Sequence, residues 1–107
     1  MIQTGPTNSI FDASTSAIGL SIGHAHDRDV KTGVTVILPS APATASVDVR
    51  GGGPGTREVM ALADGGLIEQ VHAIVLSGGS VYGLGAADGV AAYLGARGIG
   101  YKAGPPH

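Results

Sequence analysis

The chain has 107 residues, a formal net charge of −2 and no cysteine. This length allows a single domain with a modest core, and the few, scattered basic residues argue against a nucleic-acid partner. The lack of cysteine excludes disulfides, thiolate metal sites and a cysteine nucleophile, and it suits a cytoplasmic protein. No apolar run approaches the roughly 18 residues of a membrane span and no signal-peptide pattern is present, so no membrane association is expected.

Glycine is the outlier of the composition. The chain contains 19 glycines, well over twice the usual share of about 7%. They gather in clusters at 51–53, 65–66 and 78–79 and recur between 83 and 100. Such clusters predict tight turns and close backbone approaches rather than a fibrous repeat.

The first half of the chain predicts strands. Residues 1–15 are polar and rich in turn formers, which is typical of a lead-in segment. Alternating apolar residues predict a strand over 16–23. A turn over 27–29 follows, and the apolar residues of 32–38 predict a second strand, closed by Pro39 and Pro42. Residues 43–50 alternate again and predict a third strand, with Val47 and Val49 on one face.

The second half predicts two helices around one strand. After a glycine loop at 51–55, Thr56 is expected to cap a short helix that runs through Ala63, and Gly65 and Gly66 end it. Residues 71–76 predict a buried strand, and 80–97 predict the principal helix, ended by Gly98. Four glycines lie inside that helix, at 83, 85, 89 and 95. Each costs about 1 kcal/mol relative to alanine, so we expect another backbone to approach closely there.

The junction between this strand and this helix is the most informative segment. Residues 77–80 read Ser-Gly-Gly-Ser, and a strand, a tight turn and a helix start follow one another within them. Exposed N–H groups at such a turn hold anions, carbonyls or oxyanions. The segment departs from the nucleophile elbow G-x-S-x-G because Tyr82 stands at the fifth position and only His107 follows Ser80 as a base. A serine N-cap on a closely packed helix is the simpler alternative.

Three other groups of residues have a functional and a structural interpretation. The loop over 51–56 has the glycines of a phosphate loop but not its G-K-[ST] ending, so a capped surface loop with Arg57 in an ion pair is favoured. His24 and His26 lie on one face of a strand and could begin a metal site, but no third ligand is evident. A surface pair is the favoured interpretation. His72 fits a hydrogen-bonded core or rim histidine, and Asp88 fits either a packed polar contact or an acid in a pocket.

Several segments, in order and spacing, resemble one known family. They are NSI (8–10), GLSIGHA (19–25), TGVTVILP (32–39), VDVRGG (47–52), GTRE (55–58), VHA (71–73), SGGS (77–80), YGL (82–84), ADGV (87–90) and RGIG (97–100). Together they resemble the amino-terminal part of the L-aminopeptidase/D-esterase family, which includes β-peptidyl aminopeptidases and, more distantly, nylon-oligomer hydrolases and ornithine acetyltransferases.

The resemblance implies an α+β chain that forms part of an α-β-β-α four-layer sandwich of the N-terminal-nucleophile type. It implies a precursor that cuts itself before a serine or threonine, which then becomes the nucleophile of a smaller subunit and can use its own α-amino group as the base. Residues 1–107 would then be the amino-terminal part of the larger subunit, inactive alone. The implied partners are the rest of the precursor, a small peptide or amide substrate and further copies of the protein.

No catalytic residue, metal or cofactor is expected within these residues, because the family's nucleophile lies beyond them. Gly78, Gly79, Ser80 and Tyr82 are the predicted substrate-binding residues, as the wall of a cleft. A non-catalytic binding or interaction domain is the alternative function, with open strand edges pairing with another chain. A phosphate-binding module built on residues 51–56 is a weaker one.

Overall fold

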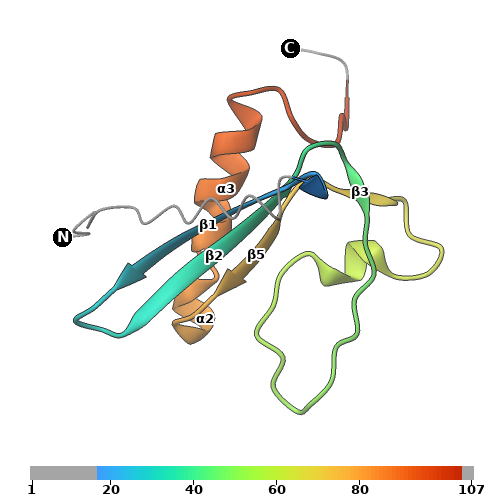
Figure 1. Ribbon diagram of the computed structural model, residues 1–107. Helices are drawn as coiled ribbons and strands as arrows, with labels where there is room; N and C mark the ends of the chain where they lie inside the picture. Colours follow the sequence, from blue (N-terminus) through green and yellow to red (C-terminus); the bar gives the residue numbers. More distant parts are fainter. Residues whose placement is uncertain (1–16, 105–107) are drawn as a thin grey trace.

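A computed structural model of the chain describes residues 17–104 as a small α+β unit (Figure 1). Its main sheet has three antiparallel strands in the order β1-β2-β5, with β1 at Leu20–Asp27, β2 at Thr32–Pro39 and β5 at Ile74–Ser77. A second, two-stranded sheet pairs β3 (Ala43–Thr44) with β4 (Gln70–Val71). The helices are the 3-10 turn η1 (Val59–Leu62), the short α2 (Ser80–Gly83) and α3 (Ala86–Gly95). The predicted lead-in segment, residues 1–15, lies outside the described residues.

A tight hairpin joins β1 to β2. Asp27 Oδ1 accepts hydrogen bonds from the N–H groups of Asp29 (2.8 Å) and Val30 (3.0 Å), which is how an aspartate side chain stabilises a turn. The turn predicted at 27–29 and the strand predicted at 32–38 are confirmed. The strand predicted over 16–23 is placed too early, since β1 begins at Leu20 and continues to Asp27.

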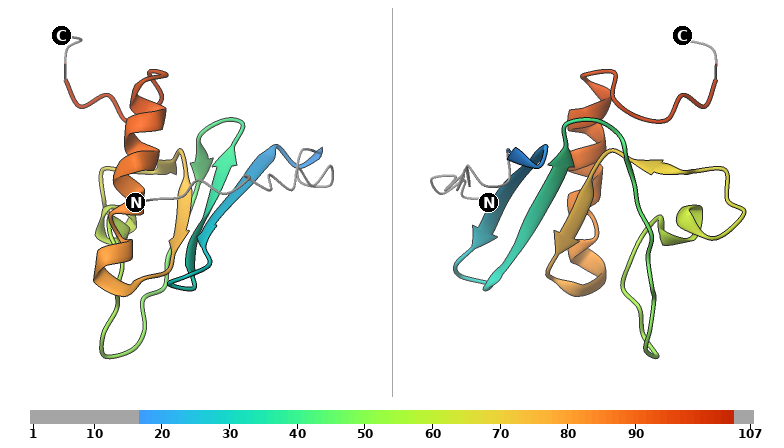
Figure 2. Two further views of the ribbon diagram at one scale, coloured as in Figure 1. Left: turned by 90° about the vertical axis from the view of Figure 1, so that its left-hand side faces the viewer. Right: turned by 45° about the vertical axis from the view of Figure 1, so that its right-hand side comes forward.

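The two faces of the main sheet have different neighbours. Helix α3 packs on β5 and covers one face (Figure 2), and Ser77 points to this side because its hydroxyl bonds the backbone of α2. Side chains alternate along a strand, so Ile74 and Leu76 lie on the other face, where they are 44% and 57% exposed. The register places Ile37 beside Ile74 and Ile22 beside Ile37 on that same face. No helix among residues 17–104 covers it.

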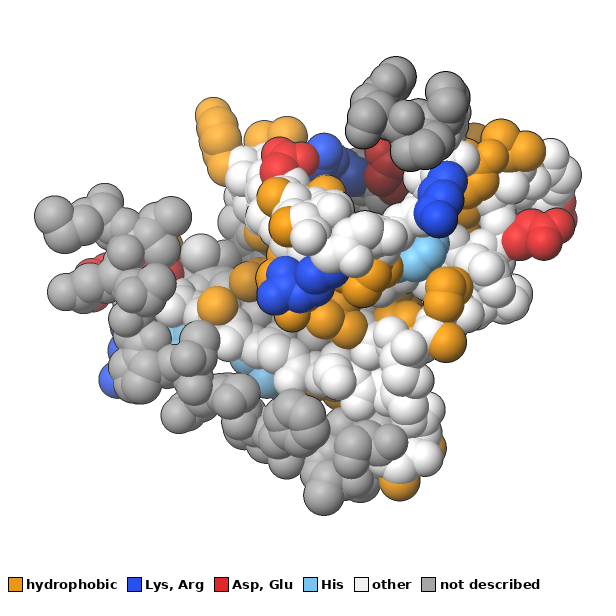
Figure 3. All heavy atoms as spheres, turned by 90° about the horizontal axis from the view of Figure 1, so that it is seen from above, with side chains coloured by type: hydrophobic (Ala, Val, Ile, Leu, Met, Phe, Trp, Pro, Cys, Tyr) orange, Lys and Arg blue, Asp and Glu red, His pale blue; other side chains and the backbone are white. Residues whose placement is uncertain are grey.

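None of the described residues is fully buried. Apolar side chains that would form a core in a self-sufficient domain are at most half-buried, and on the uncovered face Ile74 and Leu76 are exposed. Seen from above, hydrophobic side chains reach the surface beside lysine, arginine and histidine (Figure 3). Among residues 17–104 no helix combines the length and the apolar composition needed to cross a bilayer.

Three predicted elements are wrong or shortened. Only Ala43–Thr44 of the strand predicted over 43–50 pairs with another strand, and the rest runs as an extended loop without a partner strand among the described residues. Thr56 does not cap a helix: the 3-10 turn starts after Glu58, which has a φ of 63° and makes no side-chain cap. The strand predicted over 71–76 is interrupted by a bend at His72, so its residues divide between β4 and β5, and none is buried.

The helix predicted over 80–97 is divided into α2 and α3. Between them the N–H groups of Gly85 and Ala87 bond the carbonyls three residues earlier, at 3.3 and 3.2 Å, the spacing of a 3-10 turn. The predicted end is confirmed. Gly98 has a φ of 66° and donates to the carbonyl of Gly95 at 2.9 Å, as a glycine that terminates a helix does.

Candidate functional site

The four predicted site residues lie at the turn from β5 into α2. A Cβ at Gly78 would lie 2.5 Å from Thr32 Oγ1 on β2, so any side chain there requires the Thr32 side chain to shift. Gly79 has a φ of 88°, and Ser80 follows with a φ of 56°. Two successive residues in the left-handed region make a sharp change of direction, and the second is unusual for a residue with a Cβ. The prediction that the Ser80 side chain caps the helix is wrong, since the N-cap is Gly79 and no side-chain cap bond is present.

Helix α2 is pressed against the end of β5. Gly83 has no room for a side chain, because a Cβ would overlap the carbonyl oxygen of Gly78. The Ser77 hydroxyl donates to the carbonyl of Gly83 at 2.6 Å. The predicted close backbone approach is therefore confirmed at Gly83. Within residues 17–104 it is wrong at Gly89 and Gly95, where an added Cβ would meet nothing within 4 Å. Ser77 itself was missed, since a serine that ends a strand carries no sequence pattern that distinguishes it from a surface residue.

Tyr82 does not take part in this contact and is 93% exposed. Val81 beside it is 66% exposed. An exposed tyrosine and valine on a helix held tightly by its backbone form a surface that another segment can cover.

Arg57 links the glycine loop to the junction of the two helices. Its Nη1 donates to the carbonyl of Leu84 at 3.0 Å and its Nη2 to Asp88 Oδ1 at 2.8 Å. The hydrogen bond to Arg57 and then its charge lower the pKa of Asp88, and the same contacts raise the pKa of Arg57. The predicted ion pair of Arg57 is confirmed, and its partner identifies Asp88 as a polar contact between two segments.

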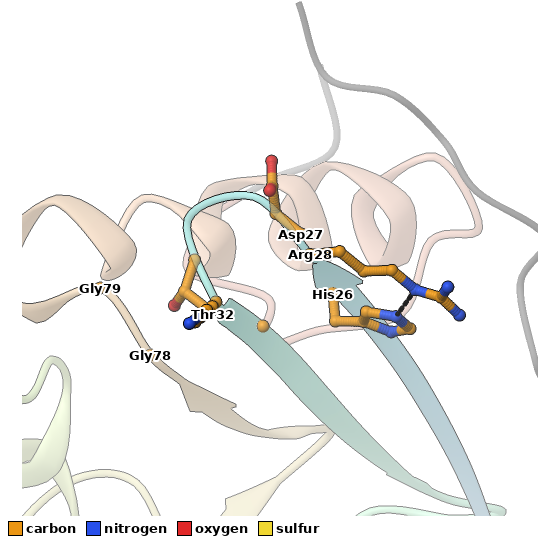
Figure 4. A pocket seen from close by; sticks show the side chains of 8 residues that line it. His26, Asp27, Arg28, Thr32, Gly78 and Gly79 are labelled. Atoms are coloured by element: carbon orange, nitrogen blue, oxygen red, sulfur yellow. Dashed lines mark hydrogen bonds between the residues drawn. The ribbon is translucent and has the colours of Figure 1, made fainter.

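An open cleft of about 580 Å³ lies between the β1–β2 turn and the Gly78–Gly79 turn (Figure 4). Its lining includes two of the four predicted site residues, Gly78 and Gly79, together with residues 26–28 and 31–33. At the β1 end of the cleft Arg28 Nε lies 3.4 Å from His26 Nε2, while Asp27 points away from the pair. Thr32 Oγ1, at the side of the cleft, is buried and has no hydrogen-bond partner within the part of the chain that the structure describes. Ser80 and Tyr82 are not part of this lining.

The histidine pair on β1 does not form a metal centre in this arrangement. His24 Nδ1 is 2.8 Å from Thr35 Oγ1, and His26 Nε2 accepts the bond from Arg28. Both side chains are exposed, and residues 17–104 contain no group of three histidine, cysteine or acidic side chains close enough to hold a metal. His72 is half-buried at the bend between β4 and β5, which places it at a rim.

Comparison with known proteins places this turn and sheet in a family. Residues 8–104 match the sequence profile of peptidase family S58. The chain belongs to this family. The match includes all the main strands, the Gly78–Gly79 turn and both α-helices.

Curated relatives carry the names of hydrolases. An uncharacterized aminopeptidase of Mycobacterium leprae (strain TN) is 41% identical over 102 residues, which cover 88% of this chain and 27% of the relative. An uncharacterized aminopeptidase of Mycobacterium tuberculosis (strain ATCC 25618 / H37Rv) is 42% identical over 81% of this chain and 26% of its own length. A 6-aminohexanoate-oligomer endohydrolase of Kocuria sp. (strain KY2) is 42% identical over 71% of this chain and 19% of its own length. The S58 chain therefore spans about a quarter of the aminopeptidase relatives it matches.

Proposed function

We propose that this S58 chain is the amino-terminal part of the larger subunit of an autoprocessed aminopeptidase or amidase. The whole protein would release N-terminal residues from small peptides, amides or esters, with a serine or threonine at the start of a smaller subunit as nucleophile. The family match over residues 8–104 carries this proposal. The names of the relatives, aminopeptidase and oligomer endohydrolase, support a hydrolase, and their greater length supports a longer precursor.

In this proposal the chain supplies a wall of the active site and no catalytic nucleophile. Gly78, Gly79 and Ser80 present the turn, and Tyr82 offers a phenol to the substrate or to the developing charge. The support is geometric: the turn is fixed by close backbone contacts, while Tyr82 is free on its outer side. A rigid support with an exposed polar group is what substrate positioning needs.

The same proposal includes the four-layer α-β-β-α sandwich. Helix α3 on one face of the main sheet would be one outer layer, and the sheet itself the adjacent layer. Ile22, Ile37, Ile74 and Leu76 form an apolar surface on the opposite face, and the second sheet would pack there. Stacked sheets lie about 10 Å apart with interdigitated side chains, and burial of this surface would supply the missing core.

The activity is tested by expressing the longer reading frame that contains these residues and assaying it on aminoacyl anilides and short peptide amides. We expect self-cleavage into two subunits and amide hydrolysis. Tyr82→Phe should lower kcat/KM by roughly 10²-fold, the scale of a lost transition-state donor. Tyr101→Phe is the matched control, because Tyr101 is also exposed (57%) but lies outside the site. Equal activity of the two variants would remove Tyr82 from the site, and a longer protein that neither cleaves itself nor hydrolyses amides would contradict the enzyme.

The sandwich is tested by a charge on the uncovered face. Leu76→Lys in the longer protein should prevent stable folding or lower the unfolding midpoint sharply, because a covered lysine has no partner there. Leu67→Lys is the control, since Leu67 is 80% exposed in a loop and a surface substitution changes stability by no more than about 0.5 kcal/mol. If the two variants unfold alike, no second sheet covers Leu76.

A non-catalytic interaction domain is the second candidate. The observation that favours it is the sheet order, because β1 and β5 each have one edge with no neighbouring strand among the described residues. Such edges pair with other chains. A longer protein that binds a partner through these strands and hydrolyses no amide would support this candidate. A cytoplasmic location, suggested by the lack of cysteine, and assembly of several copies belong to the enzyme proposal.

A further inference from the structure

Helix α2 is a single turn, so its direction depends on contacts from outside the helix. It has four residues, and glycines 79 and 85 lie on its two sides. The last carbonyls of a helix have no partner within the helix and need one elsewhere. At the end of α2 these are the carbonyls of Gly83 and Leu84, just before α3 begins.

Two side chains from other elements bond these two successive carbonyls. Ser77 of β5 donates to Gly83 at 2.6 Å, and Arg57 of the loop donates to Leu84 at 3.0 Å. Among residues 17–104 the backbone donor to the Leu84 carbonyl is the N–H of Ala87, at 3.2 Å, the long end of the usual range. Arg57 is therefore a principal partner of this carbonyl, two residues after Tyr82.

The guanidinium is itself held in direction by the first turn of α3. While Nη1 bonds Leu84, Nη2 bonds Asp88 Oδ1 at 2.8 Å. The planar guanidinium fixes the angle between its two N–H groups, so one side chain ties the end of α2 to the start of α3. Lysine cannot reproduce this, because its ammonium is a single point charge on a flexible stem.

We propose that Arg57 is a positioning residue for Tyr82: by bonding Leu84 and Asp88 together it sets the direction of α2, and thereby the place of the exposed Tyr82 phenol on the outer side of that helix. This inference rests on the proposed function of Tyr82. Arg57 itself touches neither substrate nor reacting atoms. Its side chain approaches the helices from their junction, through a loop that is 31 residues away from Asp88 in sequence.

The experiment measures kcat and KM for Arg57→Lys in the longer protein. We expect kcat to fall by about tenfold to a hundredfold, the effect of a displaced catalytic group, with a small change in KM. Arg50→Lys is the matched control. Arg50 lies in the same loop and pairs with Asp48 at 2.6 Å, but this pair is local, solvent-exposed and distant in sequence from α2. Its replacement should leave kcat unchanged.

A double-mutant cycle separates positioning from a general loss of stability. If Arg57 acts through Tyr82, Arg57→Lys should change kcat by less than about twofold when Tyr82 is already phenylalanine. An equal fall of kcat in both backgrounds would overturn the inference while leaving the role of Tyr82 intact. Normal activity of Tyr82→Phe alone would overturn both. Should Arg57→Lys fail to fold, Asp88→Asn serves as the second variant in the same cycle, since it weakens the hold on Nη2 and retains the donor to Leu84.

Discussion

Replacing Gly83 by alanine tests whether α2 is pressed against the end of β5. A Cβ at this position would overlap the carbonyl oxygen of Gly78. This atom belongs to the backbone of a neighbouring turn, so rotation of a side chain cannot relieve the overlap. The turn or the helix must move, and the bond from Ser77 to the Gly83 carbonyl moves with it.

Two opposing effects determine the size of the change. Alanine is better than glycine inside a helix by about 1 kcal/mol, while an added methyl group without space destabilises by about 1 to 3 kcal/mol. Loss of the Ser77 hydrogen bond adds about 0.5 to 1.5 kcal/mol. We therefore expect Gly83→Ala to lower the free energy of unfolding by about 1 to 3 kcal/mol.

Gly89→Ala is the matched control, because Gly89 lies in α3 and has nothing within 4 Å of its would-be Cβ. There only the helix preference acts, and the free energy of unfolding should rise by about 0.5 to 1 kcal/mol. Urea denaturation of the longer protein, followed by circular dichroism, measures both variants. A stabilising Gly83→Ala would refute the close contact between α2 and the Gly78 carbonyl.

For two further substitutions the structure determines whether the free energy of unfolding rises or falls. Thr32→Val removes a buried hydroxyl that has no partner among the described residues, so it should raise the free energy of unfolding by about 1 kcal/mol. Thr35→Val is the control, because it deletes the hydrogen bond to His24 and should not raise this free energy. Equal effects of the two substitutions in urea denaturation would mean that the Thr32 hydroxyl is hydrogen-bonded. Asp88 has a pKa below its usual 3.8 because of Arg57, so the pair stabilises the fold above about pH 4 and this contribution is lost as the pH falls through the lowered pKa. The stability difference between wild type and Asp88→Asn should therefore be present at neutral pH, shrink in high salt and vanish once the pH is below the lowered pKa. A difference that persists in acid would contradict the ion pair.

Local patterns predicted the hairpin and the helix end because their causes are local. An apolar run closed by prolines identified the β2 strand, and Gly98 ended α3 where its left-handed conformation was expected. The helix break was not predictable in this way. Four glycines in one helical pattern look alike in sequence, but among the described residues only Gly83 would have an added Cβ overlap the backbone of another segment. The Arg57 bond to Leu84 joins residues 27 apart.

The predictions of a third strand over 43–50 and of a helix capped by Thr56 are wrong because tertiary contacts, and not local patterns, determine these segments. Residues 43–50 alternate as a strand does, but a strand forms only where a partner supplies hydrogen bonds, and beyond Thr44 no described strand does so. Thr56 is a good cap by type, yet the backbone at Glu58 takes a left-handed conformation and the helix shrinks to one 3-10 turn. Local preference is a weak guide where tertiary contacts determine the backbone.

The sequence by itself determined the family, the hairpin and the place of the glycine turn, since these follow from the order of residue types along the chain. The tertiary structure decided which glycine is indispensable, which carbonyls Ser77 and Arg57 bond, and which face of the sheet stays uncovered. These properties depend on distances between segments far apart in sequence. No pattern of neighbouring residues encodes such distances, because they arise only when the sheet and the two helices pack together.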